Sequence, residues 1–268
     1  MNENLPFATV SFYDFHEVSD PELVAQEIHQ FVEGRDILGT IILATEGINS
    51  SLSGAKENLV DLLNFLQSDL GPGGESFCLN PKFTYHNKHT FPRFKIKIKP
   101  EIVTLGQPGL DPRKRVGTYL SPQEWNRVIQ DPEVVLIDAR NDYEYEVGTF
   151  RGARPAGTRH FRDFPSQVEK YLDPTKHRKV AMFCTGGIRC EKASAYLLEK
   201  GFDTVYHLQG GILHYLEQTP KDEVAWEGDC FVFDNRVALT TDLIPGDWKL
   251  CEECGQPRKP GQACNSCS

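Results

Sequence analysis

The sequence lacks the features that would place a protein in or across a membrane. No apolar run approaches the roughly 18–20 residues needed to span a bilayer, which excludes a membrane-spanning role. Residues 1–34 contain no Lys or Arg, so the basic start of a secretory signal peptide is missing. We therefore expect a soluble, cytoplasmic protein with no membrane partner, whose 8 cysteines serve catalysis or metal binding rather than disulfides.

Recognisable cofactor motifs are missing as well. The sequence shows no dinucleotide-binding glycine motif after a strand, no flavin motif and no iron site of two histidines and a carboxylate. The amino-acid composition is that of an ordinary soluble protein. A length of 268 residues suffices for two domains, each with its own core. The formal net charge of -9 argues against a polyanionic partner only as an average, because such a sum can hide a basic patch.

The first hundred residues alternate strand and helix patterns. Asp20 followed by Pro21 is typical of a helix start, and the leucines that follow residue 58 share one helical face. The expected elements are strand 7–13, a helix from Pro21, strands 37–43 and 50–53, a helix over 59–70 and strand 93–99. The order β-α-β-β-α-β predicts a ferredoxin-like, acylphosphatase-like α+β domain over residues 1–100.

Residues 101–117 are rich in Gly, Pro and basic residues and are interpreted as a linker. Ser121 and Glu124 after it have the spacing of a helix capping box. Three short apolar runs separated by helical stretches then predict a parallel α/β domain over residues 118–218, with strands at 134–138, 180–183 and 204–207. Residues 219–268 form a C-terminal extension without clear periodicity that ends in a Cys-rich tail.

One loop carries the features of a nucleophilic site. A buried strand ends at Phe183, and a helix begins after two glycines, so backbone N–H groups and the helix dipole are expected to create an anion cradle. A thiol held there has a lowered pKa, which makes Cys184 the candidate nucleophile and Arg189 the candidate partner of an anionic substrate group. The predicted substrate-binding loop consists of Thr185, Gly186, Gly187 and Ile188.

A cysteine at a strand end is more often a small packing residue, but strand, Cys, two glycines, Arg and helix together are difficult to explain as packing. Cys190 either fills the first helical turn or resolves an oxidised or persulfidated Cys184 through a disulfide. Cys78 and Cys230 carry no functional signal, and we expect both to be buried packing residues.

Four separated motifs resemble those of rhodanese domains in order and spacing. They are the segments 138–144, 148–153, 184–189 and 208–212, within about residues 116–218. The resemblance implies that Cys184 carries a persulfide during turnover and that Asp138, Arg140 and Glu144 brace the fold. Related phosphatases have one more residue between Cys and Arg, so a phosphatase is disfavoured.

The whole layout resembles the bacterial TrhO/YceA (UPF0176) family of tRNA uridine-34 hydroxylases. The resemblance rests on Thr45-Glu-Gly-Ile-Asn49, the loop 184–193, the segment Gly228 to Val237 and the Cys-rich end. It implies an oxidoreductase that forms 5-hydroxyuridine at the wobble position of tRNA, uses molecular oxygen as co-substrate and needs the loop cysteine. On this interpretation, Cys184 either passes activated oxygen through a sulfenic acid or attacks the pyrimidine ring.

A basic stretch near the end of the first domain is the candidate RNA-binding surface. Residues 82–99 contain no acid and interleave basic with aromatic residues, which suits phosphate contact and base stacking. On the last strand the basic side chains share one face, and the apolar residues between them, including Ile98, are expected to face the core. Lysines also protect exposed edge strands from mispairing, and this is the alternative interpretation. The predicted RNA-binding residues are Lys82, Lys88, Arg93, Lys95, Lys97 and Lys99, with tRNA as partner and no DNA expected.

The last 18 residues contain two Cys-x2-Cys pairs, which are typical of a structural zinc site with four thiolate ligands. The candidate ligands are Cys251, Cys254, Cys264 and Cys267. A metal-free tail is the alternative, because Cys267 is the penultimate residue and chain ends fray.

Two other functions compete with the tRNA hydroxylase. One is a sulfurtransferase that moves sulfane sulfur from thiosulfate or a persulfide donor through Cys184. The other is a non-enzymatic binding module whose loop senses oxidants. The basic stretch favours the hydroxylase over a small-molecule sulfurtransferase, and an intact anion cradle around a thiol disfavours the sensor.

Overall fold

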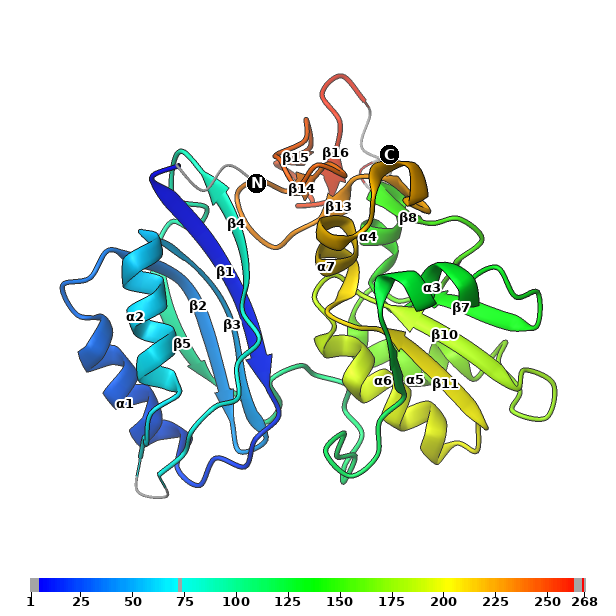
Figure 1. Cartoon of the computed structure of the whole chain (residues 1–268), viewed down its shortest axis with the longest axis horizontal. Coiled ribbons are helices and arrows are strands. Elements are labelled where there is room, and N and C mark those ends of the chain that lie inside the picture. The colour runs from blue at the N-terminus through cyan, green and yellow to red at the C-terminus, as the bar shows by residue number, and fades with distance from the viewer. Residues whose placement is uncertain (1–4, 72–73, 263–266, 268) are drawn as a thin grey trace. The chain divides into compact units, whose positions relative to one another are not determined.

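The structure is a computed structural model that describes residues 5–71, 74–262 and 267 (Figure 1). The chain divides after Thr104 into two compact units. Among the described residues, no helix is long and apolar enough to cross a membrane.

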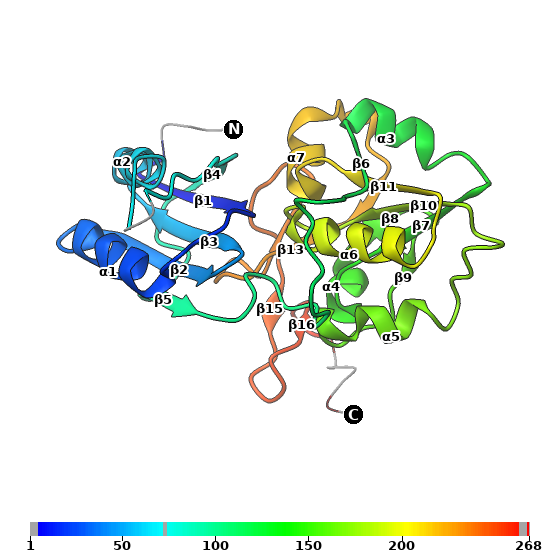
Figure 2. The same cartoon turned by 90° about the horizontal axis from the view of Figure 1, so that it is seen from below.

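The first unit is a five-stranded sheet with two helices on one face (Figure 2). The strand order is β4-β1-β3-β2-β5, in which β2 and β5 pair in parallel and the other neighbouring strands pair antiparallel. The elements are β1 (Phe7–Asp14), α1 (Pro21–Val32), β2 (Ile37–Ala44), β3 (Gly47–Gly54), α2 (Lys56–Leu66), β4 (Lys82–His86) and β5 (Phe94–Ile98).

The amphipathic patterns of the sequence explain how the helices cover the sheet. Asp20 caps α1 by accepting hydrogen bonds from the backbone N–H groups of Glu22 and Leu23, and Pro21 occupies the first helical position. The buried side chains of both helices pack with inward-facing strand residues in one core. These include Val24, Ile28 and Val32 of α1 and Leu59, Leu62, Leu63 and Leu66 of α2.

The ferredoxin-like prediction is confirmed, with one strand more than expected. The strand expected over 93–99 corresponds to β5 at one edge of the sheet, and β4 forms the opposite edge. β4 was not assigned from the sequence, although its five residues alternate between polar and aromatic side chains, because the stretch 82–99 was interpreted only as a basic surface.

The second unit contains a parallel sheet with the strand order β6-β11-β10-β7-β9. The three strands predicted from the sequence are its central ones, and the short edge strands β6 and β9 were not expected. The strands are β6 (Thr118–Leu120), β7 (Val134–Asp138), β9 (Arg154–Pro155), β10 (Lys179–Phe183) and β11 (Thr204–Leu208). The helices are α3 (Pro122–Val128), α4 (Asp142–Val147), α5 (Phe164–Val168), α6 (Ile188–Glu199) and α7 (Gly211–Gln218), with short 3-10 turns at Phe161–Asp163 and Lys221–Glu223.

The predicted capping box starts α3, since Ser121 and Glu124 satisfy each other's backbone N–H groups. α3 places Trp125 in an aromatic cluster with Phe150 of β8 (Gly148–Phe150) and Phe183 of β10. The ring centroids of Phe150 and Phe183 are 4.8 Å apart. This cluster packs directly beneath the strand end that leads into the candidate loop.

The C-terminal extension folds back onto the second unit. β12 (Trp226–Gly228) pairs with β8, and the hairpins β13 (Cys230–Phe231) with β14 (Ala238–Leu239) and β15 (Lys249–Leu250) with β16 (Pro257–Arg258) follow. Trp226 and Cys230 belong to the same buried cluster as Phe150 and Phe183. The extension therefore completes the core next to the candidate site.

Of the two cysteines that were expected to be buried packing residues, only one is buried in the structure. Cys230 is buried as expected, but Cys78 is exposed, so the expectation for Cys78 is wrong. In this irregular segment Phe77 occupies the core position, and the backbone N–H of Cys78 donates to the carboxylate of Asp14 at 2.8 Å. The side chain that follows Phe77 is left facing outward.

Candidate functional site

The candidate loop lies at the carboxyl end of the central parallel strand. β10 ends at Phe183 and α6 begins at Ile188, so residues 184–187 form the connection. Gly187 has a φ of 102°, a conformation that favours glycine, and it precedes the first turn of α6. The carboxyl ends of parallel strands are the usual location of binding sites in such sheets.

The sulfur of Cys184 is buried and surrounded by hydrogen-bond donors. The backbone N–H of Gly187 donates to Sγ at 3.2 Å. Burial alone raises the pKa of this thiol, but the Cys190 thiol, the charge of Arg189 and the backbone N–H groups of Cys190 and Gly187 outweigh it. They lower the pKa of Cys184 from 9.0 to about 5, so the group is a thiolate at neutral pH.

Cys190 lies beside Cys184 and has the opposite acid–base character. Burial, and then its interaction with the Cys184 sulfur, raise the pKa of Cys190 well above 9.0. Cys190 therefore stays a neutral thiol that donates its proton in a hydrogen bond to the Cys184 thiolate. The structure brings together the two cysteines that the resolving hypothesis requires, and in this structure both are free thiols.

Arg189 is held in place by Glu144 of α4, and its predicted contact with an anionic substrate group stays a prediction. Its Nη1 donates to Glu144 at 2.6 Å and its Nη2 donates to the same carboxylate at 2.9 Å. Nη2 also lies 3.3 Å from the hydroxyl of Thr185. Burial raises the pKa of Glu144, but the charge and hydrogen bonds of Arg189 reverse this, and the pKa is lowered overall. Both partners are charged, so Arg189 is held in a fixed position from which its charge lowers the pKa of Cys184.

One local pattern in the sequence bears on the role of Glu144. Asn141 and Glu144 have capping-box spacing at the start of α4, and Asn141 is the N-cap of that helix. The pattern indicates the helix start, but not that the Glu144 side chain also reaches the loop after β10.

The start of α7 makes close backbone contacts with the loop at residues 184–187. The N–H groups of Ile212 and Leu213 at the start of α7 donate to the carbonyl oxygens of Cys184 and Thr185 at 3.0 and 3.2 Å. A Cβ atom at Gly211 would lie 2.5 Å from the Cys184 carbonyl oxygen and 2.7 Å from the Gly187 nitrogen. Only glycine at 211 allows α7 to approach the loop this closely.

A second buried ion pair lies at the end of the adjacent strand β7. Arg140 Nε and Nη2 donate to Asp138 at 2.9 and 2.6 Å, and Nη2 also donates to the carbonyl oxygen of Gly148. Both side chains are fully buried. The hydroxyl of Thr149 donates to Asp138 at 3.0 Å. These contacts tie β7 to β8 and give Asp138 and Arg140 a bracing geometry beside the loop.

The basic stretch of the first unit is divided between the two edges of its sheet. The strand registers place Lys82, Ser11, Ser51, Thr40 and Lys95 in one row across all five strands. The hydroxyl groups of Ser11 and Ser51 lie 2.9 Å apart at its centre. The row lies on the face opposite the helices, because the next row packs in the helix-covered core and contains Phe83, Val10, Leu52 and Phe94.

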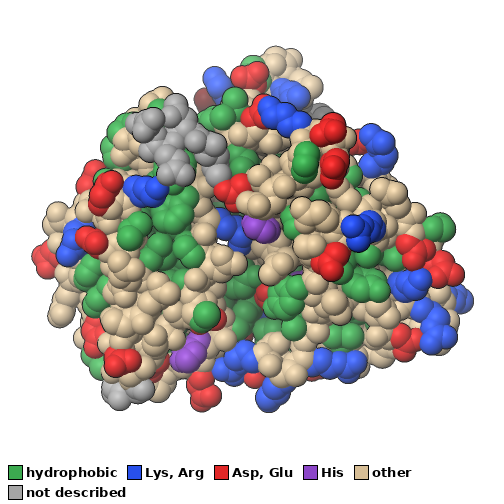
Figure 3. Space-filling model, viewed as in Figure 1, with side chains coloured by type: hydrophobic (Ala, Val, Ile, Leu, Met, Phe, Trp, Pro, Cys, Tyr) green, Lys and Arg blue, Asp and Glu red, His purple; other side chains and the backbone are tan. Residues whose placement is uncertain are grey.

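The other predicted RNA-binding residues surround this row. Lys97 shares the face of Lys95, Lys88 and Arg93 lie in the connection before β5, and Lys99 directly follows β5. Ile98 was expected to face the core but is 48% exposed, because it lies at the end of an edge strand. On the face shown in Figure 3, basic side chains lie among acidic ones, so the net charge describes no single area.

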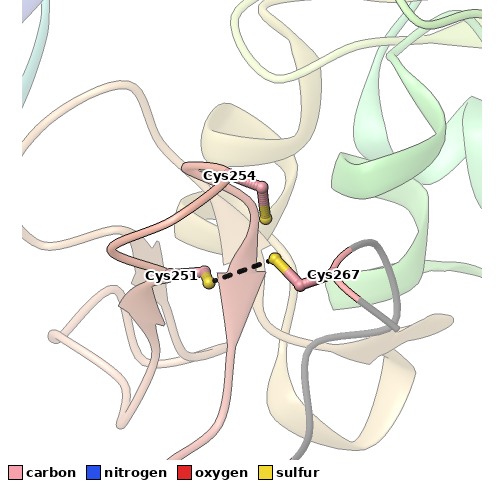
Figure 4. A group of neighbouring side chains, drawn as sticks. All are labelled: Cys251, Cys254 and Cys267. Atoms are coloured by element: carbon pink, nitrogen blue, oxygen red, sulfur yellow. Dashed lines mark hydrogen bonds between the residues drawn. The ribbon is translucent and has the colours of Figure 1, made fainter.

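Three of the four C-terminal cysteines converge in the second unit (Figure 4). The sulfur atoms of Cys251, Cys254 and Cys267 all lie within 4.8 Å of one another, and those of Cys251 and Cys267 are 3.7 Å apart. Backbone N–H groups of Cys254 and Glu253 point at the sulfur of Cys251 and lower its pKa to about 7. Cys264 lies outside the described residues.

Comparison with known proteins gives matches over nearly the whole chain. Residues 7–102 match a UPF0176 acylphosphatase like domain, and residues 121–218 match a Rhodanese-like domain. A protein from Picosynechococcus sp. named tRNA uridine(34) hydroxylase is 50% identical over 251 residues, covering 94% of this chain and 83% of the relative. A protein of the same name from Synechocystis sp. is 48% identical, covering 96% of this chain and 91% of the relative.

Among solved structures, a rhodanese-related protein from Thermoplasma volcanium is 20% identical to this chain, with a TM-score of 0.32. It covers 38% of this chain and 95% of its own length. The likeness is too weak to bear on function.

The pKa of Cys184 leads to a testable titration. We expect the ultraviolet absorbance of its thiolate to appear as the pH rises through about 5, and to be missing in Cys184→Ser. Because the folded pKa lies below the unfolded one, the thiolate stabilises the fold fully above the unfolded value, and this contribution is lost as the pH falls through about 5. Cys190→Ala removes a hydrogen-bond donor and should move the midpoint upward.

Cys230→Ala is the matched control, because Cys230 is also a buried thiol but burial raises its pKa to about 12. Its removal should leave the midpoint unchanged. A midpoint that stays near 5 in Cys190→Ala would contradict the assigned role of the Cys190 thiol.

Proposed function

The chain belongs to the family of proteins named tRNA uridine(34) hydroxylase, and we propose that it hydroxylates uridine 34 of tRNA to 5-hydroxyuridine. The observation that carries this proposal is the preformed thiolate of Cys184 within a rhodanese-like loop, in a chain related to these hydroxylases over nearly its full length. Molecular oxygen is the proposed co-substrate, and the cytoplasm is the proposed location.

The overall reaction replaces the hydrogen on C5 of the uracil ring by a hydroxyl group. One atom of molecular oxygen enters the C–O bond and the other leaves as water. The balance requires two electrons and two protons, which an external reductant supplies. The described residues provide the thiolate and its hydrogen-bond donors at this site.

Two roles of the Cys184 thiolate fit this balance. The sulfur can add to C6, which makes C5 a nucleophile that attacks oxygen at the peroxide level, formed from molecular oxygen and the two electrons of the reductant. The O–O bond then breaks and the second oxygen leaves as water. Loss of the C5 proton finally breaks the S–C6 bond and restores the ring and the thiolate. Alternatively, the sulfur is first oxidised to a sulfenic acid and transfers its oxygen to C5. In both routes Gly187, Cys190 and Arg189 stabilise the negative sulfur, either as the attacking group or as the leaving group.

The helix-free face of the first unit is the proposed tRNA surface. It combines hydroxyl groups in the central strands with lysines on both edge strands, Lys82 on β4 and Lys95 and Lys97 on β5. Ammonium groups suit phosphate contact, and Ser and Thr hydroxyls suit hydrogen bonds to phosphate and ribose. Lysines on edge strands alone would explain protection from mispairing, but not the row of hydroxyl groups between them.

The C-terminal cysteine cluster is the proposed site of a structural zinc ion. Zinc bound to thiolates at about 2.3 Å in a tetrahedron requires sulfur atoms about 3.8 Å apart. The distance of 3.7 Å between the sulfurs of Cys251 and Cys267 fits this requirement. The backbone N–H groups aimed at Cys251 would stabilise a thiolate ligand there. The metal would fix the C-terminal hairpin, and no step of the reaction depends on it.

The activity is tested in a deletion strain complemented with this protein. We expect nucleoside mass spectrometry of its tRNA to show 5-hydroxyuridine or its derivatives with the wild-type chain and none with Cys184→Ser. Cys78→Ser, which changes an exposed cysteine of the first unit, is the control and should behave as wild type. Unchanged tRNA modification in Cys184→Ser, together with abolished thiosulfate sulfurtransferase activity, would favour the sulfurtransferase instead.

A tRNA with 5-fluorouridine at position 34 separates the two roles of Cys184. If Cys184 adds to C6, release of the enzyme requires loss of the C5 hydrogen as a proton. Fluorine on C5 cannot be lost in this way, so the S–C6 bond should persist as a covalent adduct on Cys184. Repeated absence of this adduct with an active enzyme would assign the sulfenic acid route.

The RNA surface is tested with Lys95→Glu/Lys97→Glu. We expect weaker tRNA binding and a shallower salt dependence, with the slope reduced by about one unit for each phosphate that the variant no longer neutralises. The matched control is Lys170→Glu/Lys176→Glu, which makes the same charge change in the second unit. Unaltered affinity and salt dependence in the first variant would leave the lysines only the role of protecting sheet edges.

The zinc site is tested by metal analysis of untagged, full-length protein. We expect about one zinc ion per chain, and loss of this zinc in Cys251→Ser/Cys254→Ser. Cys78→Ser should retain the metal. Protein that carries no zinc after purification without chelators, and does not take it up when zinc is added, would refute the site.

A further inference from the structure

An exposed aromatic ring lies against the candidate active site and has no part in the chemistry described above. Phe233 is 60% exposed, more than any other large hydrophobic side chain among the described residues. The guanidinium carbon of Arg189 lies 5.8 Å from the centre of its ring. Single exposed hydrophobic residues are common on protein surfaces, so what distinguishes Phe233 is its position beside Arg189, whose charge acts on Cys184.

Aromatic contacts with the neighbouring hairpin and with α4 hold the ring of Phe233 in place. Phe233 packs edge-on against Phe231 of β13, with ring centroids 5.1 Å apart. Phe231 in turn packs edge-on against Tyr143 of α4 at 5.2 Å. The next residue of α4, Glu144, is the one that holds Arg189. The same short helix therefore fixes both the loop arginine and the exposed ring.

The chain around Phe233 is a tight and well-bonded turn. Asp234 accepts hydrogen bonds from Nε of Arg236 at 2.9 Å and from its Nη2 at 2.6 Å, and both side chains are largely buried. The N–H of Val232 donates to the carbonyl oxygen of Val237 at 2.9 Å, and Val237 has a φ of 64°. A non-glycine residue in this conformation indicates that the surrounding contacts determine the turn. Phe233 is thus an ordered, exposed ring.

We propose that Phe233 stacks against the uracil ring of uridine 34 and holds it at the mouth of the Cys184 loop. This inference rests on the proposed function, since it names the contact that the substrate base makes. Every base offers a flat π-face, and stacking on an aromatic side chain contributes about 1–3 kcal/mol per base. A ring that is mostly free on one side and fixed on the other is preorganised for this contact, because little side-chain entropy is lost on binding.

The test measures binding of full-length protein to an anticodon stem–loop RNA that carries either uridine or an abasic nucleotide at position 34. The wild-type chain should bind the uridine RNA about tenfold to a hundredfold more tightly. Phe233→Ala should remove this difference, Phe233→Leu should remove most of it, and Phe233→Trp should retain it. Ile244→Ala is the matched control, because Ile244 is 58% exposed in the same extension and should leave the difference intact.

Two further measurements separate the inference from a structural effect and from the proposed function. The Cys184 titration midpoint should be unchanged in Phe233→Ala, and a shifted midpoint would show that the ring merely shapes the loop. The assignment would be overturned if Phe233→Ala still bound the uridine RNA more tightly than the RNA that is abasic at position 34. It would also be overturned if Phe233→Ala removed instead an affinity difference caused by an abasic nucleotide at position 33. A wild-type chain that forms no 5-hydroxyuridine would refute the proposed function. The stacking by Phe233 is measured by RNA binding alone, so its test does not depend on that activity.

Discussion

The buried ion pair between Arg189 and Glu144 is the interaction on which the arrangement of the site depends. It joins the first turn of α6 to α4, two elements from different parts of the second unit. Removing one partner of such a pair leaves an uncompensated buried charge, at a cost of about 3–5 kcal/mol. The pair therefore fixes the distance of a positive charge from Cys184. Through Tyr143, the same helix also supports the hairpin that carries Phe233.

Three buried cysteines of the second unit show that position, not burial, decides reactivity. Burial raises the pKa of Cys184, Cys190 and Cys230 alike. Of these three, Cys184 alone receives enough donors to overcome this effect, because it lies at the strand end where backbone N–H groups turn toward one point. Cys190 is one of those donors and remains a thiol. A thiolate and its proton donor thus arise side by side from two residues of the same type.

The two folds could be predicted well from the sequence because both depend on patterns that are local. Amphipathic helices, the capping box at Ser121 and short apolar strands are visible within windows of a few residues. The predictions were weakest at sheet edges, where β4, β6 and β9 are short and their pairing partners are distant in sequence. The expectation for Cys78 was wrong for a similar reason, since only the packing of Phe77 decides which side chain faces outward.

The amino-acid order alone predicts a lowered pKa for Cys184, because a strand, the cysteine, two glycines and Arg189 before a helix favour an anion cradle at the helix start. Three features of the site became visible only in the folded chain: Glu144 engages Arg189, Gly211 admits α7 against the loop, and Phe233 lies beside it. The same holds for the lysines of one short stretch, which occupy opposite edges of a sheet. The reason is physical: hydrogen-bonding turns and helix starts are set by neighbouring residues, whereas ion pairs, close backbone approaches and strand order bring together residues far apart in the chain.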